Sequence, residues 1–213
     1  EDEPIDPATL DWDGPNDPDN PHNWATWKKW FATMTVAGLC LVVTMGSSLY
    51  VASVPVFEAR YHVSQTLGLA GLTFYLLGLS TVIFAPLSEA FGRKPIYLFT
   101  LPISMLFTMG VALSNGHMRI ILPLRFFSGL FACPALSVGS GTVMDIFDFD
   151  EVSTAAVLFS LAPFLGPVIS PIMSSFAVEA LGWRWSQYIQ LIAGGAILPF
   201  IVILPETHKG IIL

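Results

Sequence analysis

The chain has 213 residues, of which 54% are hydrophobic and 12% are charged, with a mean hydropathy of +0.66. Soluble domains carry about 25% charged residues, so this composition indicates a membrane protein and disfavours a soluble enzyme. The net charge of −7 is concentrated in residues 1–27, which hold eight of the 16 acidic residues and no Lys or Arg. The rest of the chain is close to neutral, so no basic face for nucleic acid is expected.

Residues 1–27 are predicted to form an acidic cytoplasmic N-terminal tail. Four prolines precede Asn20 and apolar residues are few, so we expect this tail to be disordered or loosely attached. It lacks the basic segment and apolar core that are typical of a signal peptide.

Residues 28–205 are predicted to form an all-α membrane domain, a bundle of six transmembrane helices. Each of six apolar segments is long enough to cross about 30 Å of hydrocarbon at about 1.5 Å per residue. Short connections predict that neighbouring helices run antiparallel, and residues 206–213 would begin a central cytoplasmic loop. The expected spans are residues 32–57, 68–88, 96–115, 120–144, 154–178 and 186–204.

The distribution of Lys and Arg predicts the orientation of this bundle. Lys28 and Lys29 flank the first span, and with the N-terminus inside, five basic residues lie on the cytoplasmic side and three outside. Because cytoplasmic loops carry an excess of Lys and Arg, we expect a multi-pass protein whose N-terminus is cytoplasmic.

The polar stretch FAPLSEAFGRKPIY interrupts the apolar sequence between the second and third spans. Gly92 provides the backbone freedom that a tight turn needs. Arg93 and Lys94 satisfy the cytoplasmic preference for cations, and they are able to pair with Glu89 or with helix carbonyls. Taken alone, such a loop is also what any membrane protein uses to set its topology.

The order of residues in this loop resembles the signature of the major facilitator superfamily, with Ala85 in place of its first glycine. Other segments resemble the fungal drug:proton antiporter branch of that superfamily. The resemblance implies a twelve-helix fold of two six-helix halves, of which this chain would be the first, in the plasma membrane. The matching segments are Leu87–Glu89 and Gly92–Lys94 in the loop, and DPDNPHNW (17–24), LRFFSGLFACPAL (124–136), FLGPVISPI (164–172), GWRW (182–185) and LPETH (204–208).

Arg125 is the candidate functional residue within a span. Placing an arginine in hydrocarbon costs on the order of 3 kcal/mol, so its side chain should face the bundle interior or a wet cavity; the alternative is that it reaches the outer headgroups. The resemblance implies contact with substrate or with the proton-coupling network. Asp145 is the second candidate for that role, although about 30 Å of helix separates it from Arg125.

Small residues follow Arg125 at a spacing of four: Gly129, Cys133, Ser137 and Gly141. Such a row allows two helices to approach closely, which predicts a packing groove; a cavity wall is the alternative. In the fifth span, the resemblance implies that Gly166 and Pro167 belong to an antiporter motif that seals the cavity, whereas the proline alone would predict only a bend.

No Asp, Glu or His lies deep in a predicted span. A proton-driven transporter needs a titratable group, so the coupling carboxylate is Asp145 or Glu89, or it belongs to another part of the transporter. No catalytic set, metal-binding pattern or cofactor motif is recognised, so we expect neither an enzyme nor a cofactor.

The predicted function is proton-coupled efflux of small lipophilic or cationic compounds by alternating access. The expected partners are the small-molecule substrate, protons, the lipid bilayer, and a missing C-terminal six-helix half or a second copy of the chain. Two alternatives stay open: a truncated or regulatory membrane fragment without transport activity of its own, and a polyamine exporter.

Overall fold

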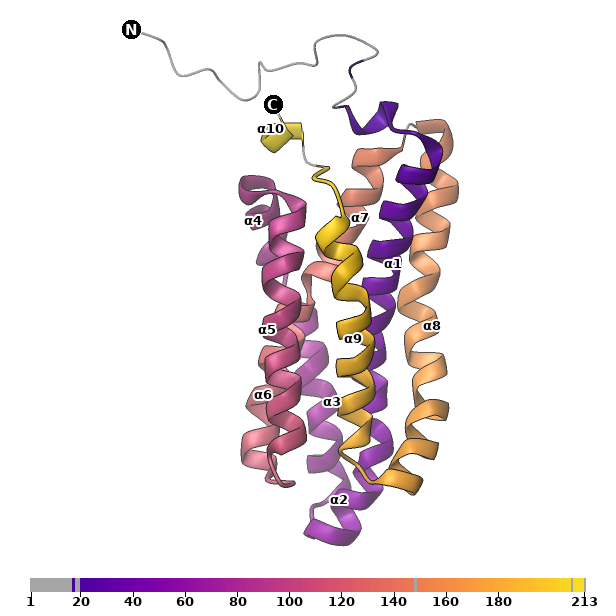
Figure 1. Cartoon of the computed structure of the whole chain (residues 1–213). Coiled ribbons are helices and arrows are strands. Elements are labelled where there is room, and N and C mark those ends of the chain that lie inside the picture. Colours follow the sequence, from indigo (N-terminus) through magenta and orange to yellow (C-terminus); the bar gives the residue numbers. More distant parts are fainter. Residues whose placement is uncertain (1–16, 18–19, 148, 208, 213) are drawn as a thin grey trace, which may run out of the picture.

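The computed structural model describes residues 17, 20–147, 149–207 and 209–212, and this part of the chain is built from helices (Figure 1). The proposed acidic tail lies mostly outside the described residues. The helices are α1 (Thr26–Leu49), α2 (Val54–Tyr61), α3 (Gln65–Leu79), α4 (Phe84–Phe91), α5 (Arg93–Leu113), α6 (Met118–Ala132), α7 (Pro134–Ile146), α8 (Phe149–Leu181), α9 (Trp185–Ile203) and α10 (Lys209–Ile212), with short 3₁₀ turns at Pro21–Asn23 and Val51–Ser53.

These helices form six crossings of an up-and-down bundle. Five are long and apolar enough to span a membrane, and the pair α3 and α4, bent by 40° at residues 80–83, makes the sixth. The predicted six-helix membrane fold is confirmed. The crossings begin between one and six residues before the predicted spans, because helices continue through the headgroup region, where hydropathy no longer marks them.

Besides the first crossing, in which the 3₁₀ turn Val51–Ser53 separates α1 from α2, two of the six crossings are interrupted. The second is interrupted between α3 and α4, and the fourth at Cys133, where Pro134 begins α7. Proline has no backbone N–H to donate a hydrogen bond to the preceding turn. An interrupted helix therefore leaves carbonyls that need other donors. The two breaks meet, since the Cys133 thiol donates to the carbonyl of Thr81.

Helix α1 occupies the centre of the bundle. It packs against α8, α9, α7 and α3, and Figure 1 shows it beside α9 and α8. Its buried side chains contribute much of the main apolar core, which also takes residues from α5, α7 and α9. Helix α8 is the opposite case: Phe164 is 73% and Phe176 71% exposed, so its outer face is available to lipid or to another bundle.

The two ends of the bundle differ in what they hold. The upper end in Figure 1 holds α4, α10 and the start of α1, and the lower end holds α2. A second apolar cluster closes the lower end, with Tyr50, Phe57 and Trp183 among its buried members.

Candidate functional site

Arg125 lies inside the bundle, on α6, with no exposed surface. Its guanidinium donates to the carbonyl of Gly46 from both terminal nitrogens, at 3.0 and 3.1 Å, and to the carbonyl of Gly71 at 3.3 Å. One side chain therefore ties α6 to α1 and α3. Because this side chain has no exposed surface, it does not extend out of the bundle, as the alternative of reaching the outer headgroups would require.

The charge of Arg125 is stabilised without a carboxylate among the described residues. Gly46 lies in the last turn of α1, where helix carbonyls lack intrahelical donors and the helix dipole is negative. The rings of Tyr50 and Tyr75 lie 4.3 and 4.7 Å from the guanidinium carbon, and aromatic faces attract cations. Carbonyls and ring faces together replace the water that a buried arginine loses.

A polar layer continues from Tyr75 to α9. The Tyr75 hydroxyl donates to the carbonyl of Val43 at 2.8 Å and lies 3.4 Å from the Gln190 amide nitrogen. Gln187, one turn earlier on α9, donates to Ser186 at 3.1 Å. The side-chain oxygens of Gln187 and Gln190 are buried, and within the described residues neither has a hydrogen-bond partner. Two acceptors are therefore available inside the bundle.

The charged loop from Glu89 to Lys94 lies at the upper end of the bundle. Arg93 pairs with Asp145 through Nε and Oδ2 at 3.0 Å and donates to the Ser88 hydroxyl at 3.1 Å. Its carboxylate partner is thus Asp145 from α7, whereas Glu89 is exposed. As expected from their separation, Asp145 and Arg125 make no contact with each other: they belong to opposite ends of the fourth crossing.

Glu206 caps the start of α5. Its two carboxylate oxygens accept hydrogen bonds from the backbone nitrogens of Arg93 and Lys94, at 2.9 and 3.1 Å. A carboxylate satisfies the free N–H groups at a helix N-terminus and interacts favourably with the helix dipole. The cap requires the turn at Gly92, whose backbone φ of +92° is a value that residues with a Cβ rarely adopt.

The acidic segment of residues 145–155, at the end of the fourth crossing, is paired with basic side chains from other helices. Besides the Arg93–Asp145 pair, Lys29 of α1 lies 4.0 Å from the carboxylate of Glu151. The sequence shows four acidic residues between 145 and 155 and no cation. The fold supplies the compensating charges from the first and third crossings.

The row of small residues serves two different contacts. Gly129 lies against the backbone of Tyr75, where a Cβ would overlap the carbonyl oxygen, so α3 and α6 touch closely. Gly141 lies under Arg93: a Cβ there would be 2.8 Å from its guanidinium nitrogens. Ser137 donates to the Cys133 carbonyl of its own helical segment at 3.3 Å. The row therefore meets different neighbours along its length, the backbone of α3 at Gly129 and the side chain of Arg93 at Gly141.

Comparison with known proteins identifies the family. A sequence profile of the Major Facilitator Superfamily matches residues 20–211. The chain belongs to the major facilitator superfamily. The members to which it is similar are transporters and not enzymes, as the sequence predicted.

Three fungal relatives illustrate the similarity. The chain is 78% identical to Polyamine transporter 4 of Saccharomyces cerevisiae over 99% of its own length and 32% of that protein. It is 34% identical to an efflux pump of Floropilus chiversii, covering 99% of the chain and 40% of the pump. It is also 34% identical to a multidrug transporter of Candida glabrata, covering 96% and 36%. The chain thus spans roughly a third to two fifths of these relatives.

A solved structure supports the fold independently of close sequence similarity. The crystal structure of the peptide transporter POT (E310Q mutant) in complex with alafosfalin superposes with a TM-score of 0.61 over 87% of this chain and 40% of that one, at 14% identity. At this identity the likeness shows the fold alone. It agrees with the six-helix arrangement expected for part of a major facilitator transporter.

The segment that holds Gly166 and Pro167 lies at the contact between α8 and α1. Gly166 is buried against Leu41, Thr44 and Met45, so a side chain there would collide with the backbone of α1. Pro167, the next residue, is half-buried and lies within a continuous helix. The pair therefore lies where the fifth crossing approaches the central helix closely.

Several contacts of the site were not recognised from the sequence. They are the rings of Tyr50 and Tyr75 beside Arg125, the carboxylate cap formed by Glu206, and the two buried glutamines of α9. A usable signal existed for the glutamines, since Gln187 and Gln190 are spaced by three on an otherwise apolar helix and share one face.

Proposed function

We propose that this chain forms the N-terminal six-helix half of a proton-coupled polyamine exporter. The observation that carries the proposal is the 78% identity to Polyamine transporter 4 of Saccharomyces cerevisiae. Efflux of other small lipophilic or cationic compounds is the second candidate, favoured by the more distant efflux pump and multidrug transporter. In this proposal the N-terminus is cytoplasmic and the membrane is the plasma membrane.

The polar layer supports a cationic substrate. A polyamine carries ammonium groups that need acceptors once they leave water, and the side-chain oxygens of Gln187 and Gln190 are buried acceptors without a described partner. Tyr75 lies beside Gln190, and an aromatic ring face adds attraction for a cation. We propose that these three residues form this half's share of the substrate path.

Arg125 has a coupling role in this proposal rather than direct contact with the polyamine. Two unit charges 4 Å apart repel by about 4 kcal/mol at an effective dielectric constant of 20, so an ammonium group beside the guanidinium would be disfavoured. The guanidinium already occupies the Gly46 and Gly71 carbonyls. A cation arriving near Tyr75 would compete for these acceptors, which links substrate binding to the contacts between α1, α3 and α6.

Proton coupling is proposed to involve Asp145, Glu89 or a carboxylate in the C-terminal half. Asp145 is favoured over Glu89 within this chain because it is paired with Arg93. Protonation of its carboxylate would remove the charge that holds α5 to α7 at the upper end. Gly166 and Pro167, in the fifth crossing, would keep α8 sealed against α1 during this change.

The experiment uses a chimera in which this chain replaces the matching segment of the yeast relative. Yeast lacking its own polyamine exporters is loaded with labelled spermine, and export is measured with and without a proton gradient. We expect export that depends on the gradient and that Arg125→Ala abolishes. Arg119→Ala is the matched control, since Arg119 lies on the same helix but is exposed.

Other results would redirect the proposal. Export of a lipophilic dye but not of spermine would favour the drug-efflux candidate. Normal amounts of chimera at the membrane with no export of either compound would contradict a transport role and favour a regulatory fragment. Expression of the 213-residue chain by itself tests whether two copies replace the second half.

A further inference from the structure

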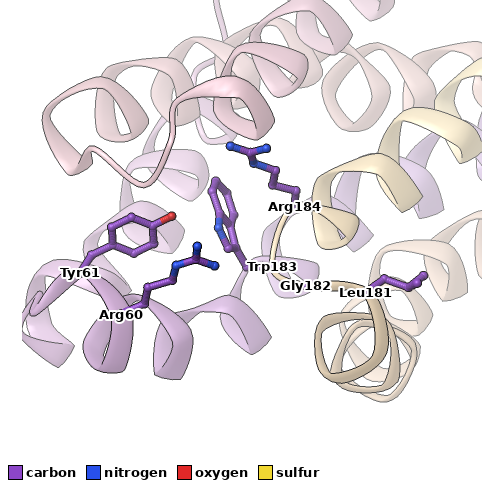
Figure 2. A pocket seen from close by; sticks show the side chains of 6 residues that line it. All are labelled: Arg60, Tyr61, Leu181, Gly182, Trp183 and Arg184. Atoms are coloured by element: carbon purple, nitrogen blue, oxygen red, sulfur yellow. The ribbon is translucent and has the colours of Figure 1, made fainter.

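The lower end of the bundle contains a cationic pocket whose lining includes no residue of the polar layer. Its volume is about 260 Å³, and it lies where the end of α2 meets the turn from α8 to α9. Figure 2 shows the guanidinium groups of Arg60 and Arg184 directed toward the indole of Trp183. The lining residues are Arg60, Tyr61, Leu181, Gly182, Trp183 and Arg184.

The floor of this pocket is held in place by the lower core. Trp183 is 4% exposed and packs edge-on against Phe57, with ring centroids 4.9 Å apart. Its carbonyl accepts a hydrogen bond from the Ser53 hydroxyl at 3.3 Å. Gly182, with φ of +95°, ends α8 and turns the chain so that Trp183 points inward while Arg184 remains exposed. The position of the indole is therefore fixed by the fold.

The two guanidinium groups have donors to spare. Each guanidinium carries five N–H donors and no acceptor. Arg184 donates to the side-chain oxygen of Asn115 at 2.5 Å, which orients it, and Arg60 makes no hydrogen bond in the described part of the chain. Neither forms an ion pair with any described carboxylate, including Glu58 and Glu179 on the adjoining helices.

An anion would relieve the repulsion between these like charges. We propose that the pocket binds a phosphate group between Arg60 and Arg184, with the Trp183 ring as its apolar wall. Guanidinium groups match phosphate oxygens through paired N–H donors. The pocket lies at the ends of the candidate membrane spans and is lined by Tyr61 and Trp183, and such aromatic residues are enriched at the level of the lipid headgroups. The phosphate belongs to an anionic phospholipid or is free in solution, and the inference is independent of the transported substrate.

Two measurements on the purified chain test this site and separate the two sources. Native mass spectrometry measures the retention of phosphatidylglycerol against phosphatidylcholine. Thermal unfolding in detergent measures stabilisation by inorganic phosphate at constant ionic strength. We expect the Arg60→Gln, Arg184→Gln double variant to lose about tenfold in binding of one or both ligands, while Arg119→Gln, an exposed arginine at the same end, binds like the wild type.

Each result bears on the proposal. Loss of lipid retention alone assigns the site to a headgroup, and loss of phosphate stabilisation alone assigns it to free phosphate. Wild-type binding of both ligands by the double variant overturns the proposal. If the double variant does not fold, the wild-type chain decides: equal retention of the two lipids together with no stabilisation by phosphate overturns the proposal as well.

Discussion

Replacement of Arg125 by Ala tests whether a buried guanidinium holds three crossings together. Its three shorter hydrogen bonds, of 3.0–3.3 Å, reach two carbonyls, those of Gly46 and Gly71, and a longer one of 3.5 Å reaches the carbonyl of Ser47. Hydrogen bonds to charged groups contribute about 1.5–3 kcal/mol each. The loss is therefore about 3–6 kcal/mol, before any contribution from the rings of Tyr50 and Tyr75.

The expected effect is measurable as a melting temperature in detergent. For proteins of about 150–250 residues, 1 kcal/mol corresponds to about 2–4 °C, so Arg125→Ala should lower the melting temperature by at least about 6 °C. The melting temperature of Arg125→Lys should lie between those of Arg125→Ala and the wild type, because an ammonium group keeps the charge but cannot reproduce the planar fork of donors. Arg119→Ala, on the exposed face of the same helix, should leave the melting temperature unchanged.

A melting temperature for Arg125→Ala within about 1 °C of the wild type would refute this reasoning. It would mean that the carbonyls of α1 and α3 do not depend on the guanidinium. Loss of export in the chimera with an unchanged melting temperature would then assign Arg125 to transport alone.

Three further predictions concern close contacts and charges. Gly129→Val should lower the melting temperature and the folded yield, at a cost of about 1–3 kcal/mol or more from overpacking against α3; a wild-type melting curve would contradict the contact. Asp145→Asn should lower stability by about 1–3 kcal/mol, because it leaves the largely buried guanidinium of Arg93 without its carboxylate, and should alter the pH dependence of export, which Glu179→Gln, at an exposed carboxylate outside the proposed coupling set, should preserve. Glu206→Gln should weaken the start of α5 by about 0.3–1 kcal/mol, seen as faster amide hydrogen exchange at Arg93; unchanged exchange there would remove the cap from the account.

Local sequence was sufficient for the membrane fold. Apolar segments of span length exist before any helix packs, because insertion into hydrocarbon depends on the composition of about 20 consecutive residues. The same argument singled out Arg125, whose charge is costly wherever its helix turns. The loop from Glu89 to Lys94 was recognisable since its glycine and cations are adjacent in the chain. These features also carried the resemblance to the major facilitator superfamily, which the profile match over residues 20–211 shows.

The partners of these residues were decided by the tertiary structure. The carbonyls that accept hydrogen bonds from Arg125 lie 79 and 54 residues earlier in the chain. Asp145 and Arg93, which form an ion pair, are separated by 52 residues. Such pairs depend on how each helix is rotated and where it breaks, and hydropathy does not encode rotation. The sequence by itself therefore determined which groups had to be kept from lipid; only the packing of the six crossings decided which carbonyls, rings and carboxylates meet them.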